Sequence, residues 1–146
     1  MTLSGGDARS ALVRCYRWLR QHGLNDSHSG NASLRDGDCA WVTPTGCCGD
    51  TLQPEELLRC PLDDAPPGGA SLDAPLHLAV YAANPAARAV LHSHGPHSIA
   101  MTLAGGDFRP QDFEGRYYFP TVPVLDIPHE AYVARSPAAV AAALAS

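Results

Sequence analysis

The chain has 146 residues, a formal net charge of −5, 45% hydrophobic residues and 17% charged residues. These values are ordinary for a globular protein, and we expect residues 1–146 to form a single domain with a proper core. The negative charge and the lack of a basic stripe argue against a nucleic-acid partner. No apolar run approaches the length of a membrane span.

The cysteines and the N-terminus bear on the compartment. The first residues lack the basic and apolar regions of a signal peptide. The five cysteines are irregularly spaced and form no CxxC motif, which indicates reduced thiols and predicts a cytoplasmic protein. For the adjacent pair Cys47-Cys48, two small loop residues are favoured over a redox or metal role.

The first half of the chain is predicted to contain two helices and one strand. Apolar residues at helical spacing predict a helix over residues 7–22, which Gly23 closes in a left-handed turn. The polar loop over residues 24–31 would suit an anion, but its composition is more typical of an ordinary turn. There follow a strand over residues 39–43, a short helix over 54–58 and a loop over 61–70.

The second half is predicted to contain three helices and two strands. A helix over residues 74–83 follows Asp73, which is well placed to be its N-cap. After it we expect a strand from Ala89, a helix over 96–103 and an irregular stretch over 108–118. We then expect an edge strand over 121–125 and a last helix over 138–145, which Ser136-Pro137 opens.

The stretch over residues 89–97 carries the main functional signal. It reads as a short buried strand that ends in His92 and His94. Because strand side chains alternate faces, the two imidazoles point the same way, with their Cα atoms about 6.5–7 Å apart along the strand. Two such histidines are a reasonable half of a metal site, although paired histidines also occur as surface residues. Asp73 could cap its helix, bind a metal or move a proton, and spacing alone does not choose.

Four sequence blocks resemble the class II aldolase/adducin family. The blocks are Gly30-Asn31-Ala32-Ser33, Thr43-Pro44-Thr45-Gly46, Ser71-Leu72-Asp73-Ala74-Pro75-Leu76-His77 and Ala89-Val90-Leu91-His92-Ser93-His94. Their order and separations fit the family throughout, so the likeness covers nearly the whole chain. It implies an α/β fold, a three-layer α/β/α sandwich with a mixed, mostly antiparallel central sheet. The alternation of strands and helices alone would have suggested a parallel sheet.

The resemblance also implies the contents of the site. It implies a divalent metal, usually zinc, a homo-oligomer, usually a tetramer, and phosphorylated keto-sugars or related sugar acids as substrates. His92 and His94 match two metal-binding histidines of the family, and Asp73 matches its acidic residue. The positions that hold the substrate phosphate in the family correspond here to Asn31, Thr45, Gly46 and Ser71.

These parts predict a zinc-dependent aldolase-type lyase that cleaves a small phosphorylated keto-sugar. The cleavage leaves an enediolate whose negative charge needs a Lewis acid, and a carboxylate such as Asp73 can move the proton. A sugar-phosphate 4-epimerase, a dehydratase or a decarboxylase would use the same site. The alternative in which the protein is not an enzyme is a non-catalytic module like the adducin head.

Three departures from the family bear on this prediction. The third metal histidine of the family lies further downstream, so the chain is expected to be truncated after Ser146 or to complete the site through Asp73, His129 or a neighbouring chain. Leu72 stands where a small polar residue is usual, and Asp73 is shorter than the glutamate of many members. His77 is expected to be packed or to face a partner, and His97 to lie behind the metal ligands.

Overall fold

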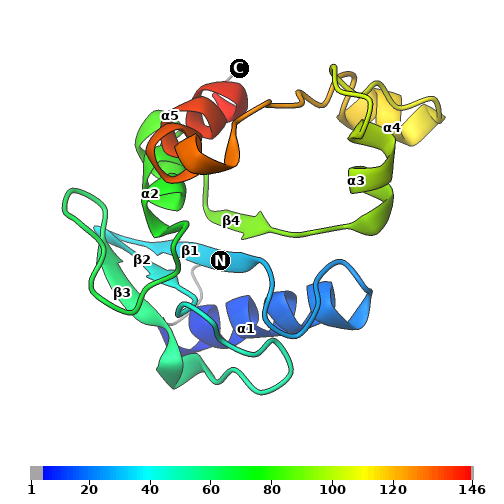
Figure 1. Ribbon diagram of the computed structural model, residues 1–146. Helices are drawn as coiled ribbons and strands as arrows, with labels where there is room; N and C mark the ends of the chain where they lie inside the picture. The colour runs from blue at the N-terminus through cyan, green and yellow to red at the C-terminus, as the bar shows by residue number, and fades with distance from the viewer. Residues whose placement is uncertain (1–4, 146) are drawn as a thin grey trace.

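A four-stranded sheet forms the middle layer of the molecule (Figure 1). The computed structural model describes residues 5–145. The strands are β1 (Asn31–Asp36), β2 (Cys39–Val42), β3 (Leu58–Pro61) and β4 (Ala89–His92), in the order β3-β2-β1-β4. All three pairings are antiparallel. The α/β class implied by the resemblance is confirmed, and the parallel sheet suggested by alternation is not observed.

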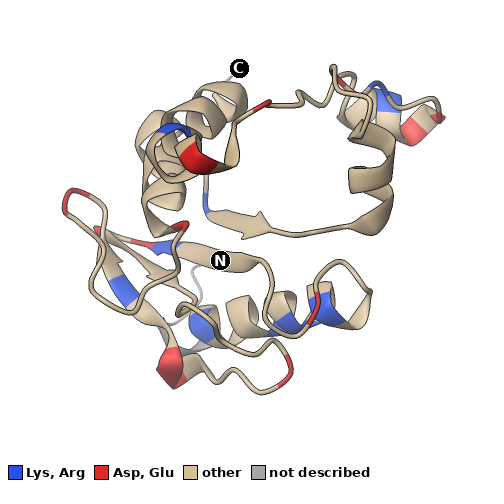
Figure 2. Ribbon diagram, in the orientation of Figure 1, with Lys and Arg blue, Asp and Glu red and all other residues tan. Residues whose placement is uncertain are grey.

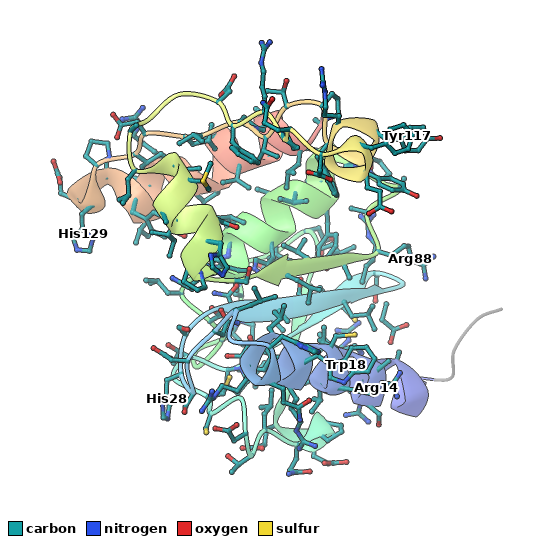
Figure 3. All side chains as sticks on the ribbon, turned by 90° about the vertical axis from the view of Figure 1, so that its right-hand side faces the viewer. Arg14, Trp18, His28, Arg88, Tyr117 and His129 are labelled. Carbon is teal, nitrogen blue, oxygen red and sulfur yellow. The ribbon has the colours of Figure 1, made fainter. Side chains whose placement is uncertain are left out.

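Helices cover both faces of this sheet. α1 (Gly5–Gln21) lies on one face, and α2 (Ala74–Ala83) and α5 (Tyr132–Leu144) lie on the other, which gives three layers (Figures 1 and 3). The core between α1 and the sheet consists of Leu12, Val13, Tyr16, Ala32, Leu52 and Leu57. The core between α2 and the sheet consists of Ala40, Val42, Cys60, Ala74, Leu78 and Tyr81.

Two further helices extend away from the sheet. α3 (Pro96–Thr102) and α4 (Phe113–Tyr118) form the part of the molecule that we call the α3–α4 arm, residues 96–122 (Figure 1). Neither helix contains a buried residue. The exposed fraction reaches 85% at Phe113, 80% at Leu103 and 74% at Tyr117. The arm therefore presents large apolar side chains to solvent.

Two strands of the sheet were not predicted. β1 begins inside the stretch that reads as a polar loop, because Asn31, Arg35 and Asp36 hide any alternation of apolar residues. β3 begins at Leu58, where a helix was expected, and only the 3-10 turn η1 (Pro54–Glu56) forms there. Strands of four to six residues depend on packing against their neighbours, which the local sequence does not reveal.

The strand predicted from Ala89 to His94 is shorter and more exposed than expected. β4 ends at His92, so His94 lies beyond the strand. β4 is also an edge strand that pairs with β1 alone, and Leu91 is 48% exposed rather than buried. Of the two apolar residues Val90 and Leu91, Val90 packs against α2 in the core and Leu91 does not. Burial in the core therefore accounts for only one of them.

The prediction for the C-terminal region was wrong in two places. The strand expected over residues 121–125 is absent among the described residues, where only an isolated bridge joins Phe108 and Val122. The last helix begins at Tyr132 and contains Pro137, although proline usually opens a helix. An internal proline costs one backbone hydrogen bond, and the packing of α5 on α2 compensates for that loss.

The helix α4 was not predicted either, because it lies in the stretch over residues 108–118 that was expected to be irregular. Four other elements lie close to their predicted positions. α1, β2, α2 and α3 agree with the predictions to within about two residues, which is the usual uncertainty of such boundaries. Gly23 closes α1 at a φ of 69°. All five cysteines are free. None of the helices between residues 5 and 145 combines the length and the apolarity needed to cross a membrane.

Candidate functional site

The pairing of β1 with β4 brings two of the predicted site residues together. Asn31 at the start of β1 lies opposite His92 at the end of β4. Opposed residues of an antiparallel pair have Cβ atoms about 4.5–5.5 Å apart. The side chains of Asn31 and His92 therefore point to the same face, and the Nδ2 of Asn31 lies 3.2 Å from the Nδ1 of His92.

Asp73 joins this pair from the beginning of α2. Although it occupies the N-cap position, its carboxylate makes no capping hydrogen bond. Instead Oδ2 accepts hydrogen bonds from Asn31 Nδ2 at 2.7 Å and from His92 Nδ1 at 2.8 Å. The hydrogen bond from His92, and after it the one from Asn31, lower the pKa of Asp73 to about 2. The carboxylate is therefore ionised at neutral pH and faces the site.

These contacts define the tautomer of His92. Because Nδ1 carries the proton donated to Asp73, Nε2 has a free lone pair, the arrangement that carboxylates impose on metal-binding histidines. The ring of His94 stacks on that of His92, with centroids 4.7 Å apart and planes at 27°. The backbone N–H of His94 is held by Leu24 and Asn25, the residues that follow α1.

A cavity of about 410 Å³ collects the predicted site residues. All seven of them line it: Asn31, Thr45, Gly46, Ser71, Asp73, His92 and His94. The Thr45 N–H is bound to the carbonyl of Gly69, and the Ser71 N–H to that of Thr43, so the two loops are tied together. The wall of the cavity thus combines imidazoles, a carboxylate, the Asn31 amide and the hydroxyl groups of Thr45 and Ser71.

Gly30 permits the close approach of β1, β4 and the loop after α1. Its φ is 69°, and a Cβ at this position would collide with the backbone carbonyl of His92 and the side-chain amide of Asn25. Only glycine combines that conformation with that lack of space. The residue before Asn31 is therefore a structural requirement of the site.

Two residues that sequence reasoning did not assign to the site also line the cavity. Tyr132, the first residue of α5, has its pKa raised to about 12 by burial and by the charge of Asp73, and it is hydrogen-bonded to that carboxylate. His28 lines the cavity from the loop after α1. Tyr132 was missed because α5 begins earlier than predicted. His28 was missed because its loop has the composition of an ordinary turn.

His129, the candidate for a further metal ligand, also lines the cavity. It lies in the 3-10 turn η2 (His129–Ala131) on the α5 side of the sheet, whereas His28 belongs to the α1 side. Figure 3 shows both at the same side of the molecule. His77 is buried behind the cavity, as expected for a packed residue, and His97 is exposed on α3.

The donor atoms can be compared with the needs of a divalent metal. A catalytic zinc site takes three protein ligands and leaves one position open. Between residues 5 and 145, no group of three or more His, Cys, Asp and Glu side chains is arranged to hold a metal ion. His92 and His94 offer two imidazoles, and the Asp73 contact on His92 is the support that a metal ligand needs. The described residues therefore fit part of a metal site.

Comparisons with known proteins agree with this arrangement. Residues 10–146 match the family described as Class II Aldolase and Adducin N-terminal domain. The crystal structure of L-fuculose-1-phosphate aldolase from Thermus thermophilus superposes with a TM-score of 0.84 at 33% identity, covering 94% of this chain and 70% of that one.

Two curated proteins are similar in sequence. The 3-oxo-tetronate 4-phosphate decarboxylase of Cupriavidus necator is 34% identical over 99 residues, which are 66% of this chain and 46% of that protein. The 5-methylthioribulose-1-phosphate/5-deoxyribulose-1-phosphate aldolase of Escherichia coli O45:K1 is 30% identical over 94 residues, 63% of this chain and 44% of that protein. The chain spans about half the length of the curated relatives that it matches.

Proposed function

This chain belongs to the class II aldolase and adducin family, and we propose that it is a metal-dependent lyase acting on a small phosphorylated keto-sugar or sugar acid. Known members of the family include aldolases and decarboxylases, and the family generally uses a divalent metal. The observation that carries the proposal is the contact of Asp73 with His92 at the wall of the 410 Å³ cavity. The similar decarboxylase and aldolase both act on phosphorylated compounds by name, which supports the substrate class.

Each part of the cavity has a role in this proposal. His92 and His94 would hold the divalent metal, zinc being our choice because imidazole suits it. The metal, when bound, supplies the Lewis acid that stabilises negative charge developing on substrate oxygens. Thr45, Gly46 and Ser71 would hold the phosphate away from the reacting carbons and so fix the orientation of the substrate. Asn31, the fourth predicted phosphate ligand, has its amide on Asp73 beside His92, so it would meet the phosphate only close to the metal.

Asp73 would move the proton, and Tyr132 would support it. Asp73 is ionised and holds His92 in one tautomer, and its carboxylate has acceptor capacity beyond the two bonds at Oδ2 for a substrate hydroxyl. Tyr132 keeps its proton at neutral pH because its pKa is about 12. It therefore donates a hydrogen bond to the Asp73 carboxylate, and in this proposal it would hold that carboxylate in place beside His92.

The test combines metal analysis with product analysis on the purified chain. We expect about one zinc per chain, lost in His92→Ala and retained in His97→Ala, which removes an exposed histidine on α3 outside the cavity. The loaded protein is then incubated with ketopentose phosphates, 5-methylthioribulose 1-phosphate and 3-oxo-tetronate 4-phosphate. Two carbonyl fragments indicate cleavage, carbon dioxide indicates decarboxylation, loss of water indicates dehydration, and an intact epimer indicates 4-epimerisation.

The alternative is a non-catalytic module like the adducin head. The observation that favours it is that, among residues 5–145, no third ligand is grouped with His92 and His94, whereas a catalytic zinc site takes three. A chain that binds no zinc and turns over none of these compounds would support the module and overturn the proposed lyase.

We also propose a homo-oligomer, of which a tetramer is the expected form. The α3–α4 arm supports this proposal, because Phe113, Tyr117 and Leu103 are large apolar side chains that are mostly exposed, and such side chains gathered on one surface are typical of protein contact sites.

A further inference from the structure

A row of polar side chains joins α2 to β1 behind the cavity, and we call it the polar seam. It pairs three residues of α2, spaced four apart, with three residues of β1, spaced two apart. Four residues of a helix rise about 6.0 Å and two residues of a strand about 6.7 Å, so the two spacings nearly match. The members are Asp73, His77 and Tyr81 on α2, and Asn31, Ser33 and Arg35 on β1.

The contacts in the polar seam are short and mostly buried. Asn31 donates to Asp73 at 2.7 Å. The Ser33 hydroxyl lies 2.7 Å from His77 Nδ1 and 2.7 Å from the Tyr81 hydroxyl. Arg35 donates to the backbone carbonyl of Tyr81 at 3.0 Å. All of these hydrogen bonds can therefore form together at only one register of α2 against β1.

The central hydrogen bonds can run in a direction that satisfies both contacts of Ser33, with Tyr81 and with His77. Burial lowers the pKa of His77 to about 4, so at neutral pH the ring has one N–H and one acceptor nitrogen. The backbone N–H of Val90 donates to the Tyr81 oxygen. The Tyr81 proton is then available to Ser33 Oγ, and the Ser33 proton to His77 Nδ1.

This direction leaves the Nε2–H of His77 as a buried donor with no partner among the described residues. His77 lies one turn after Asp73 on the same helix, near enough for the Asp73 charge to act on it. Asn31, which contacts Asp73 directly, has a buried acceptor without a partner, Oδ1. Unpaired buried polar atoms are rare in native proteins, and these two belong to neighbouring steps of the same seam.

We infer that His77 is a positioning residue that holds the Asp73 carboxylate on His92. By binding Ser33 it fixes the register of α2 on β1, and the register places the first turn of α2 beside the end of β4. The inference rests on the proposed function in one respect only, namely that the Asp73–His92 contact has a role in catalysis. His77 itself touches neither the cavity nor a reacting group.

The test follows the Nδ1–H resonance of His92 by NMR, in metal-free protein labelled with ¹⁵N-histidine. In the unmodified chain we expect a His92 Nδ1–H proton that is protected by its hydrogen bond to Asp73. His77→Asn places an amide near the position of Nδ1 and is expected to keep the signal. His77→Leu and Ser33→Ala remove the central hydrogen bond and are expected to lose it.

Leu12→Ala is the matched control, because it weakens the core on the opposite face of the sheet without touching the polar seam. It is expected to lower Tm and to keep the His92 signal. The inference is overturned if folded His77→Leu or Ser33→Ala keeps the signal, or if Leu12→Ala loses it as well. Should His77→Leu fail to fold, Ser33→Ala decides. Because neither metal nor substrate is present, a failure to bind zinc or to cleave sugar phosphates overturns the proposed function alone.

Discussion

Asp73 is the side chain whose charge the proposed chemistry needs most directly. Asp73→Asn keeps the size of the residue but removes the ionised acceptor that holds His92 and takes the substrate proton. We expect kcat/KM to fall about 10²–10⁴-fold, the usual contribution of a positioned acid or base. The measurement is the initial rate on whichever phosphorylated compound the chain turns over. Asp126→Asn, an exposed carboxylate outside the cavity, should leave the rate unchanged; a rate within threefold for Asp73→Asn would contradict the assigned role.

His77 makes the stability of the fold depend on pH. Its pKa is about 4 in the folded chain against an ordinary 6.5, so below pH 6.5 the unfolded chain takes up a proton that the folded chain does not. The free energy of unfolding should therefore be highest above pH 6.5 and fall, by up to about 3 kcal/mol, as the pH drops towards 4. Asp73, with its pKa lowered to about 2, contributes stability that is lost only between about pH 4 and 2.

Urea unfolding at pH 7.5, 5.5 and 4.5 measures this dependence. His77→Asn cannot titrate, so the difference between the two chains should shrink steadily over this range as the unmodified chain loses its advantage. A parallel decline in both chains would show that another group is responsible.

Gly30 and Gly37 offer a matched comparison of two left-handed glycines. Their φ values are 69° and 60°, but a Cβ at Gly30 would collide with the His92 carbonyl, whereas Gly37 has open space around it. Gly37→Ala should cost only about 1–2 kcal/mol for the left-handed conformation. Gly30→Ala should cost clearly more by chemical denaturation and should also weaken zinc binding, since it displaces His92. Equal costs would contradict the close packing.

At the residue scale, the candidate site was largely predictable from the sequence. The short motifs around Asn31, Thr45, Ser71 and His92 place backbone and polar groups at fixed offsets, and all their site residues line one cavity. The contact of Asp73 with His92 could not be predicted, because it depends on the register of α2 on β1. Tyr132 was missed because it reaches the cavity from a helix whose start the sequence does not reveal.

At the scale of elements, α5 is stabilised by its contact with α2. Ala141 is buried there against Leu76 and Val80, whereas its neighbour Ala142 is exposed. Ala141→Asp should lower the free energy of unfolding by about 3 kcal/mol or more, because a carboxylate without a partner enters an apolar contact. Ala142→Asp has nearly the same effect on helix propensity and should cost below about 1 kcal/mol. Similar Tm values for the two variants would show that α5 is not anchored at Ala141.

The elements that could be predicted are those whose sequence carries their own signal. α1 has a complete apolar stripe, and α2 is a long apolar run between Asp73 and Pro85. β1 and β3 have no such signal and exist because each pairs with β2. The expected strand over residues 121–125 shows the converse, since apolar, β-branched residues do not form a strand without a neighbouring strand to pair with.

At the scale of the whole molecule, the α3–α4 arm should govern assembly. The double variant Phe113→Ser/Tyr117→Ser removes two of its most exposed aromatic side chains and is expected to lower the mass of the particle in light scattering coupled to size-exclusion chromatography. Trp18→Ser removes an aromatic residue that is 51% exposed on α1 and should leave the mass unchanged. An unchanged mass for the double variant would place the contact between copies elsewhere.

The composition of the cavity wall has a consequence for how quickly an anionic compound arrives. None of the described residues that line the cavity is lysine or arginine, and residues 89–106, which include β4 and α3, contain no Lys, Arg, Asp or Glu (Figure 2). Because the chain has a net charge of −5, the phosphorylated compound that we propose as substrate would be repelled at long range. It would be attracted only once it is inside the cavity. Dissolved salt shields that repulsion, so raising the salt concentration should speed the encounter of such a compound with the cavity.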